Sequence, residues 1–162
     1  MSQNIFIILC IIFVGLLIIA EYRIAKQLNS GLLKWVAKPA ASLAFVFVAL
    51  TGGALETTYG CWILIGLAFC LLGDVFLIPA GNRTFLAGMS AFALGHLGYV
   101  GAFLSTEPEI SGLFLIGSAG MAGFAILALR WLWPHLAEFK WPVTAYSAII
   151  AVMVATSFLA AP

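Results

Sequence analysis

The sequence predicts an all-α, polytopic membrane helix bundle with about six transmembrane helices, forming a single membrane domain over residues 1–162. Hydrophobic residues make up 64% of the chain and charged residues only 8%, whereas soluble domains are about 25% charged. The mean hydropathy is +1.17. Several apolar runs reach about 20 residues, the length at which a helix crosses a bilayer. The net charge of +1 gives no basic patch of the kind that nucleic acid requires.

Polar interruptions delimit the six helices. The first apolar run has no basic residues before it and no small-residue cleavage site, which favours a retained helix over a cleaved signal peptide. The second is predicted to begin around Lys38, with Pro39 in its first turn, where proline is tolerated. The third contains Asp74 as its one charge and ends at Pro79. The predicted helices lie near residues 4–20, 37–55, 59–79, 84–104, 111–133 and 143–161.

The basic residues predict an orientation for these helices. All seven fall in or beside the first, third and fifth loops, whereas the second and fourth loops carry only glutamates. The positive-inside rule makes the first group of loops cytoplasmic, so the amino terminus is predicted to lie outside. The basic residues are Arg23, Lys26, Lys34, Lys38, Arg83, Arg130 and Lys140.

Asp74 is the most informative residue of the chain. An ionised carboxylate inside a membrane helix costs about 2.5–3.5 kcal/mol, and such residues are usually functional. Asp74 precedes Pro79 by five residues, so it is predicted to lie about 7.5 Å inside the cytoplasmic end of its helix. Lys38 starts the preceding helix on the same side and can reach it. Two alternatives remain open: Asp74 can be structural, and Lys38 can merely mark the membrane edge.

The predicted helix at 84–104 carries a stripe of aromatic, small and polar residues at three- and four-residue steps. Its glycines and aromatics are typical of helix packing, whereas His96 and Tyr99 can be functional. His96 is predicted to lie about 10 Å deeper than Asp74, so we expect both to line one elongated cavity. The stripe consists of Phe85, Gly88, Phe92, Gly95, His96, Tyr99 and Phe103.

The cysteines do not indicate a metal or disulfide site. Cys10, Cys61 and Cys70 are odd in number, lie in apolar runs and form no CxxC pair, so they read as small buried hydrophobic residues. No His, Cys and carboxylate set has metal-ligand spacing, and no cofactor is predicted.

These motifs resemble the YhhN-like lysoplasmalogenase family of integral membrane proteins. The resemblance rests on Lys38–Pro39, on Leu72–Gly73–Asp74–Val75–Phe76–Leu77 and on the stripe from Phe85 to Tyr99, with Glu21 also fitting the pattern. It extends from about Glu21 to Ala155. Family members usually have about eight helices and a second, Ser–Asp motif near the carboxyl end. By internal repetition that aspartate would fall near position 177, so the sequence is interpreted as a fragment or a reduced member.

The resemblance implies that the protein hydrolyses the vinyl-ether bond of lysoplasmalogen, a lysophospholipid substrate among the membrane lipids. A carboxyl group in apolar surroundings tends to stay protonated, which suits an acid that protonates the enol ether. The resemblance thus implies catalytic roles for Asp74, His96 and Tyr99. It implies substrate-binding roles for Lys38, Glu21, Gly73 and Phe92. If two aspartates are needed, the 162-residue chain is expected to bind lysolipid but turn it over slowly.

Two other classes of function use the same residue types. A proton-coupled transporter or channel would use an intramembrane aspartate as a relay, together with a histidine and a tyrosine. A packing or scaffold protein would use the glycines and aromatics without chemistry. The residues by themselves do not separate these classes, and the resemblance favours the hydrolase.

Overall fold

The computed structural model describes residues 31–107 and 109–160, together with residues 8, 11–12, 14–15, 18–19 and 22. The described residues are all-helical and contain no strand. They form five α-helices, so the predicted count of six is not confirmed. The predicted helix 4–20 lies largely outside the described part, although the residues described within it are helical.

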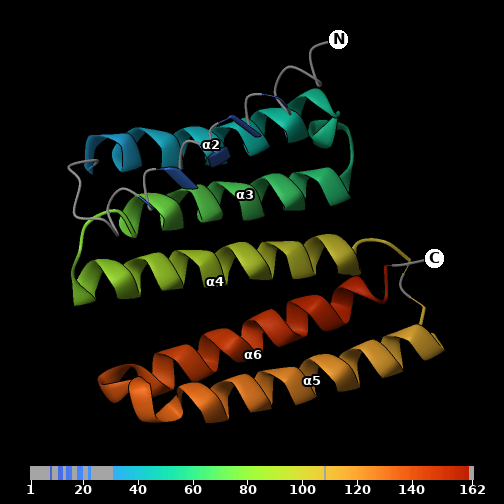
Figure 1. Cartoon of the computed structure of the whole chain (residues 1–162). Coiled ribbons are helices and arrows are strands. Elements are labelled where there is room, and N and C mark those ends of the chain that lie inside the picture. The colour runs from blue at the N-terminus through green and yellow to red at the C-terminus, as the bar shows by residue number, and fades with distance from the viewer. Residues whose placement is uncertain are drawn as a thin grey trace.

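The five α-helices lie side by side in the order α2, α3, α4, α6, α5 (Figure 1). Helix α6 therefore lies between α4 and α5, and the last two helices form a hairpin that packs on α4 through α6. Four segments are long and apolar enough to cross a membrane, and these are 58–76, 82–104, 112–135 and 137–157. The chain is an integral membrane protein.

Helix α2 spans Gly31–Thr51 and differs from the prediction at both ends. It begins six residues before the predicted start of 37, so Pro39 lies in the helix interior and the prediction that it occupies the first turn is wrong. Proline has no N–H to donate to the preceding turn, and membrane helices tolerate this loss because neighbouring groups compensate. The helix ends before Gly53, whose φ of 80° is left-handed and stops it short of residue 55.

Alanines form the face by which α2 approaches α3. Ala37, Ala41 and Ala44 are 0%, 6% and 4% exposed and recur at helical spacing. Side chains this small allow two helices to pack closely in a membrane. Lys38 and Ser42 lie one position further along the same turns, so they are brought to the edge of this contact.

The tightest packing of the fold joins α3, Thr58–Phe76, to α4, Asn82–Leu104. The Thr57 hydroxyl accepts a hydrogen bond of 2.9 Å from the Gly60 N–H and caps α3. Along the contact a Cβ at Gly98 would lie 3.0 Å from both the Cα and the N of Gly66. The two backbones therefore touch, and any larger residue at this point would force the helices apart.

Helices α5, Gly112–Leu132, and α6, Lys140–Ser157, are joined by two short 3₁₀ segments, Trp133–His135 and Ala137–Phe139. The predicted ranges of 111–133 and 143–161 match these helices to within four residues. The connecting loop contacts the start of α4. The side-chain amide of Asn82 donates a 2.6 Å hydrogen bond to Glu138, and the rings of Phe85 and Phe139 meet edge to face at 5.1 Å.

Candidate functional site

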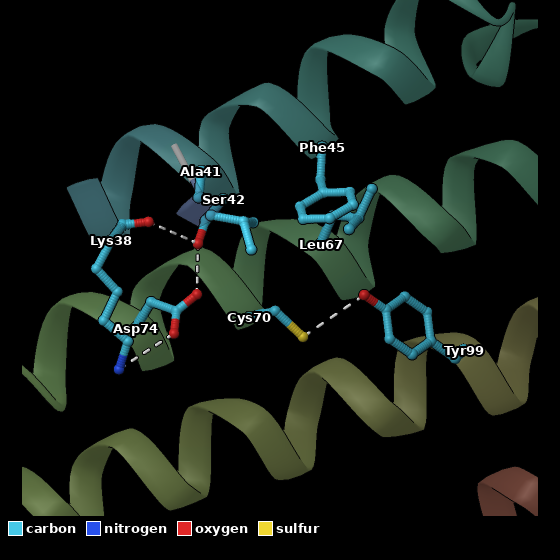
Figure 2. A pocket seen from close by; sticks show the side chains of 9 residues that line it. Lys38, Ala41, Ser42, Phe45, Leu67, Cys70, Asp74 and Tyr99 are labelled. Carbon is cyan, nitrogen blue, oxygen red and sulfur yellow. Dashed lines mark hydrogen bonds and ion pairs between the residues drawn. The ribbon is translucent and has the colours of Figure 1, made fainter. Parts of the chain in front are cut away.

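The site is built around Asp74, which lies one residue after the tightly packed Gly73 near the end of α3. The Lys38 Nζ lies 3.4 Å from Asp74 Oδ1, which confirms the predicted contact between the two residues. The Ser42 hydroxyl, one turn further along α2, donates a hydrogen bond to Asp74 Oδ2. Figure 2 shows both side chains of α2 converging on the carboxylate. The side chains of Lys38 and Asp74 are 18% and 22% exposed, so little solvent screens the pair.

The contact with Asp74 reduces the number of roles that the sequence left open for Lys38. A lysine that pairs with a carboxylate has its charge compensated. While both groups are ionised, their charges therefore balance at the end of the cavity that lies beside Asp74. The geometry shows Lys38 in contact with Asp74 rather than only marking the membrane edge. Its predicted role in binding the substrate, through the phosphate, stays a prediction.

A cavity of about 380 Å³ opens beside the carboxylate, between α2, α3 and α4. Asp74, Lys38 and Ser42 lie at one end of it and Tyr99 at the other (Figure 2). Most of the remaining wall is apolar, so a ligand with a hydrocarbon portion fits it. The described lining consists of Val14, Lys38, Ala41, Ser42, Phe45, Leu67, Cys70, Asp74 and Tyr99.

Tyr99 reaches the cavity from α4. Its hydroxyl lies 3.5 Å from the Cys70 sulfur, which comes from the turn of α3 before Asp74. Cys70 was predicted to be a small buried hydrophobic residue, and its place in the cavity wall was missed. Cys70 precedes Asp74 by four residues, and positions i and i+4 of a helix share a face. This spacing is the sequence signal that places Cys70 beside Asp74.

Ser42 was also missed. It stands four residues after Lys38, so any orientation of α2 that aims Lys38 at Asp74 also aims Ser42 near it. A serine in an apolar run carries no charge and no aromatic ring, so Ser42 was not among the predicted site residues.

His96 lies elsewhere. Among the described residues it does not line the cavity with Asp74, so the expected common cavity is not observed. Its Nδ1 is 2.6 Å from the carbonyl oxygen of Phe92, and its ring meets that of Tyr146 of α6 edge to face at 5.6 Å. The physical reason is helical rotation. Gly95 faces α3, Tyr99 four residues later faces the same way, and His96 is turned about 100° away.

Gly73 and Phe92 are placed as packing partners. A Cβ at Gly73 would lie 2.6 Å from the Phe92 ring, so the glycine makes room for the aromatic side chain. Phe92 also lines a second, apolar cavity of about 270 Å³ with Leu77, Phe85, Met89, Val143 and Tyr146. Their predicted roles in substrate binding remain predictions. Glu21 lies outside the described residues.

Within the part of the chain that the structure describes, no three His, Cys, Asp or Glu side chains gather closely enough to hold a metal ion. The polar groups of the cavity are instead one carboxylate, one ammonium, two hydroxyls and one thiol. Such a set can transfer protons and orient water without further ligands.

Comparison with known proteins found similar membrane proteins and lysoplasmalogenases. A lysoplasmalogenase from Mycobacterium bovis is 32% identical over 106 residues, which cover 61% of this chain and 40% of that protein. The bovine lysoplasmalogenase TMEM86A is 34% identical over 93 residues, or 56% of this chain and 36% of its own length. The Escherichia coli protein named uncharacterized membrane protein YhhN is 27% identical over 121 residues, covering 75% of this chain and 56% of that protein.

The chain thus spans roughly half or less of the length of these relatives. No solved structure matches it. The model of the YhhN family matches residues 33–161, which include α3, α4 and all of α2 except its first two residues, the three helices around the cavity. The chain belongs to the YhhN family.

Proposed function

We propose that this chain is a membrane-embedded hydrolase that cleaves the vinyl-ether bond of lysoplasmalogen, releasing a fatty aldehyde and a glycerophospho-base. The observation that carries the proposal is a carboxylate held by two side chains at the end of a mostly apolar cavity. The names of the relatives from Mycobacterium bovis and cattle point to the same reaction. The bond to be cleaved is uncharged and continues into a hydrocarbon chain, which matches the mostly apolar cavity.

The chemistry requires an acid and then a base. Asp74 is paired with Lys38 as a carboxylate, so it must first take up a proton from solvent. It then gives that proton to the enol-ether carbon that is not bonded to oxygen. The electrons of the double bond form the new C–H bond, and the adjacent carbon becomes an oxocarbenium ion. Glycosidases pass through the same kind of ion using carboxyl groups. Lys38, 3.4 Å away, stabilises the carboxylate that remains.

Water completes the reaction. It adds to the oxocarbenium carbon and returns a proton to Asp74, which forms a hemiacetal. The hemiacetal then breaks its bond to the glycerol oxygen, which takes up the hemiacetal proton, and the aldehyde leaves. Tyr99 lines the cavity opposite Asp74, and its hydroxyl is the group placed to orient this water. His96 lies behind Tyr99, with their rings 6.1 Å apart, and supports that side chain without lining the cavity itself.

The test is Asp74→Asn in the full chain, assayed for aldehyde release from lysoplasmalogen in detergent or nanodiscs. The amide still accepts the Ser42 hydrogen bond but has no carboxylic proton, so we expect at least about a 10²-fold loss of turnover. Glu138→Gln makes the same change of acid to amide in the loop before α6, outside the cavity, and should keep wild-type turnover. Wild-type turnover by Asp74→Asn would refute the proposal. Proton transport by the wild-type chain without aldehyde release would favour the transporter alternative instead.

A further inference from the structure

The two oxygens of Asp74 are held unequally. Oδ2 accepts a hydrogen bond from the Ser42 hydroxyl. Oδ1 faces the Lys38 ammonium at 3.4 Å, well beyond the roughly 2.7–2.9 Å of a close charge-assisted hydrogen bond. Among the described residues of the lining, the other polar side chains are Cys70 and Tyr99, and these contact each other and make no hydrogen bond to the carboxylate. Oδ2 is therefore fixed by a directional bond, whereas Oδ1 has a looser ionic contact.

Ser42 is itself held in place for this bond. Its hydroxyl oxygen also lies 3.2 Å from the backbone carbonyl of Lys38, one turn earlier in α2. A serine that shares its proton with the carbonyl four residues before it keeps its side chain close to the helix. One hydroxyl proton thus has two acceptors, the Lys38 carbonyl and Asp74 Oδ2. This arrangement holds the Ser42 oxygen against Asp74 even when the carboxyl group is neutral.

We propose that Ser42 is a positioning residue of the reaction, which anchors Oδ2 and leaves Oδ1 as the oxygen that exchanges the proton with the substrate. This role rests on the proposed function. A carboxyl group without an anchor can turn about its Cβ–Cγ bond and exchange its two oxygens. With Oδ2 fixed, only Oδ1 is free to carry the transferable proton, and the flexible Lys38 side chain can give way beside it. Ser42 acts through Asp74 and does not itself react.

An infrared measurement tests the contact without requiring turnover. The carboxyl band of Asp74 is obtained as the difference between the spectra of the full wild-type chain and Asp74→Asn. Ser42→Ala should shift this band because the hydrogen bond to Oδ2 is lost. Ser42→Thr keeps the hydroxyl and should preserve the band, whereas Ser42→Cys keeps the shape with a weaker donor and should shift it. Ser157→Ala loses a comparable bond to a backbone carbonyl, 2.7 Å long, away from any carboxylate, and should leave the band unchanged.

The kinetic measurement tests the role in the reaction. Ser42→Ala should lower kcat for aldehyde release by about 10- to 100-fold with little change in KM, because misplacing a reacting group affects the transition state most. Ser42→Thr should recover most of kcat. Size-exclusion profiles and helical content identify any variant that fails to fold, and Ser42→Cys then replaces Ser42→Ala.

The outcomes separate the two proposals. If Asp74→Asn abolishes turnover while Ser42→Ala keeps the wild-type band and the wild-type kcat, the role of Ser42 is overturned and the proposed function stands. A shifted band with unchanged kcat also overturns it, because the contact then exists without positioning the reaction. If Asp74→Asn turns over normally, the proposed function fails and takes the role of Ser42 with it.

Discussion

The contact between Lys38 and Asp74 should make a measurable contribution to stability, and a double-mutant cycle isolates it. The three variants are Lys38→Met, Asp74→Leu and the combination of both. Coulomb's law at 3.4 Å and an effective dielectric constant of about 20 gives an attraction of about 5 kcal/mol. Desolvation of the two charges lowers the cost of every variant but cancels in the cycle. We therefore expect a coupling energy of up to about 5 kcal/mol.

The single variants should be less stable than the double variant. Each leaves one charge in a mostly apolar cavity without its partner, and each should therefore lose about 3 kcal/mol, the lower end of the range for breaking a buried ion pair. The double variant replaces both charged groups by apolar side chains and should lose little. Ser42 is not left without an acceptor in Asp74→Leu, because the Lys38 carbonyl lies 3.2 Å from its hydroxyl.

Unfolding by sodium dodecyl sulfate from mixed micelles, followed by circular dichroism, gives the four free energies. Glu138→Gln, in an exposed loop, serves as the control and should stay within about 0.5 kcal/mol of wild type. A coupling energy below about 0.5 kcal/mol lies within the additivity expected of independent sites. That result would mean that the ion pair between Lys38 and Asp74 does not form in the folded protein. The site would then lack the electrostatic contact described for it.

Two further predictions concern the fold. Gly98→Leu should destabilise the protein by about 1–3 kcal/mol or prevent folding, because a Cβ at this position would lie 3.0 Å from the Gly66 backbone. The matched change Gly120→Leu in α5 should be tolerated in the same unfolding assay, because no described residue lies within 4 Å of a Cβ there. In a chain with its native cysteines replaced, Gly81→Cys should react with a membrane-impermeant thiol reagent from the cytoplasmic side and Glu109→Cys from the outside, since the seven basic residues favour that orientation. The opposite labelling pattern would contradict the orientation.

The sequence was sufficient for the location of α3, α4, α5 and α6, because long apolar runs are the strongest signal that a membrane protein carries. It was insufficient for α2. The residues Lys34, Lys38 and Pro39 read as a polar boundary, and the helix begins before all three of them. A lysine near a helix end can extend its amine toward water, and a membrane helix can contain proline, so neither residue type ends a helix there.

The candidate site was predicted in part, and the limit was helical rotation. The predicted depths of Lys38 and Asp74 along their helices were enough to predict that the two residues meet. The partners Ser42 and Cys70 depend on which face each helix turns to its neighbour, and a single sequence leaves that rotation open. The same limit explains His96. The predicted stripe on α4 placed His96 and Tyr99 on one face of the helix. In the structure the glycines of α4 face α3, so His96 is turned toward Tyr146 instead.

The structure also explains why stability and chemistry are hard to separate at Asp74. Backbone contacts between glycines join α3 and α4 into one unit. Asp74 lies on α3 of this unit and Tyr99 on α4. Helix α2 is joined to α3 by small alanines and by the bonds from Lys38 and Ser42 to Asp74. A variant that removes Asp74 alone can therefore lose activity because α2 has moved, without any role in proton transfer. The double variant of Lys38→Met and Asp74→Leu separates the two effects. It should fold with nearly wild-type stability because no charge is left unpaired, and it should release no aldehyde because the cavity no longer contains a carboxyl group.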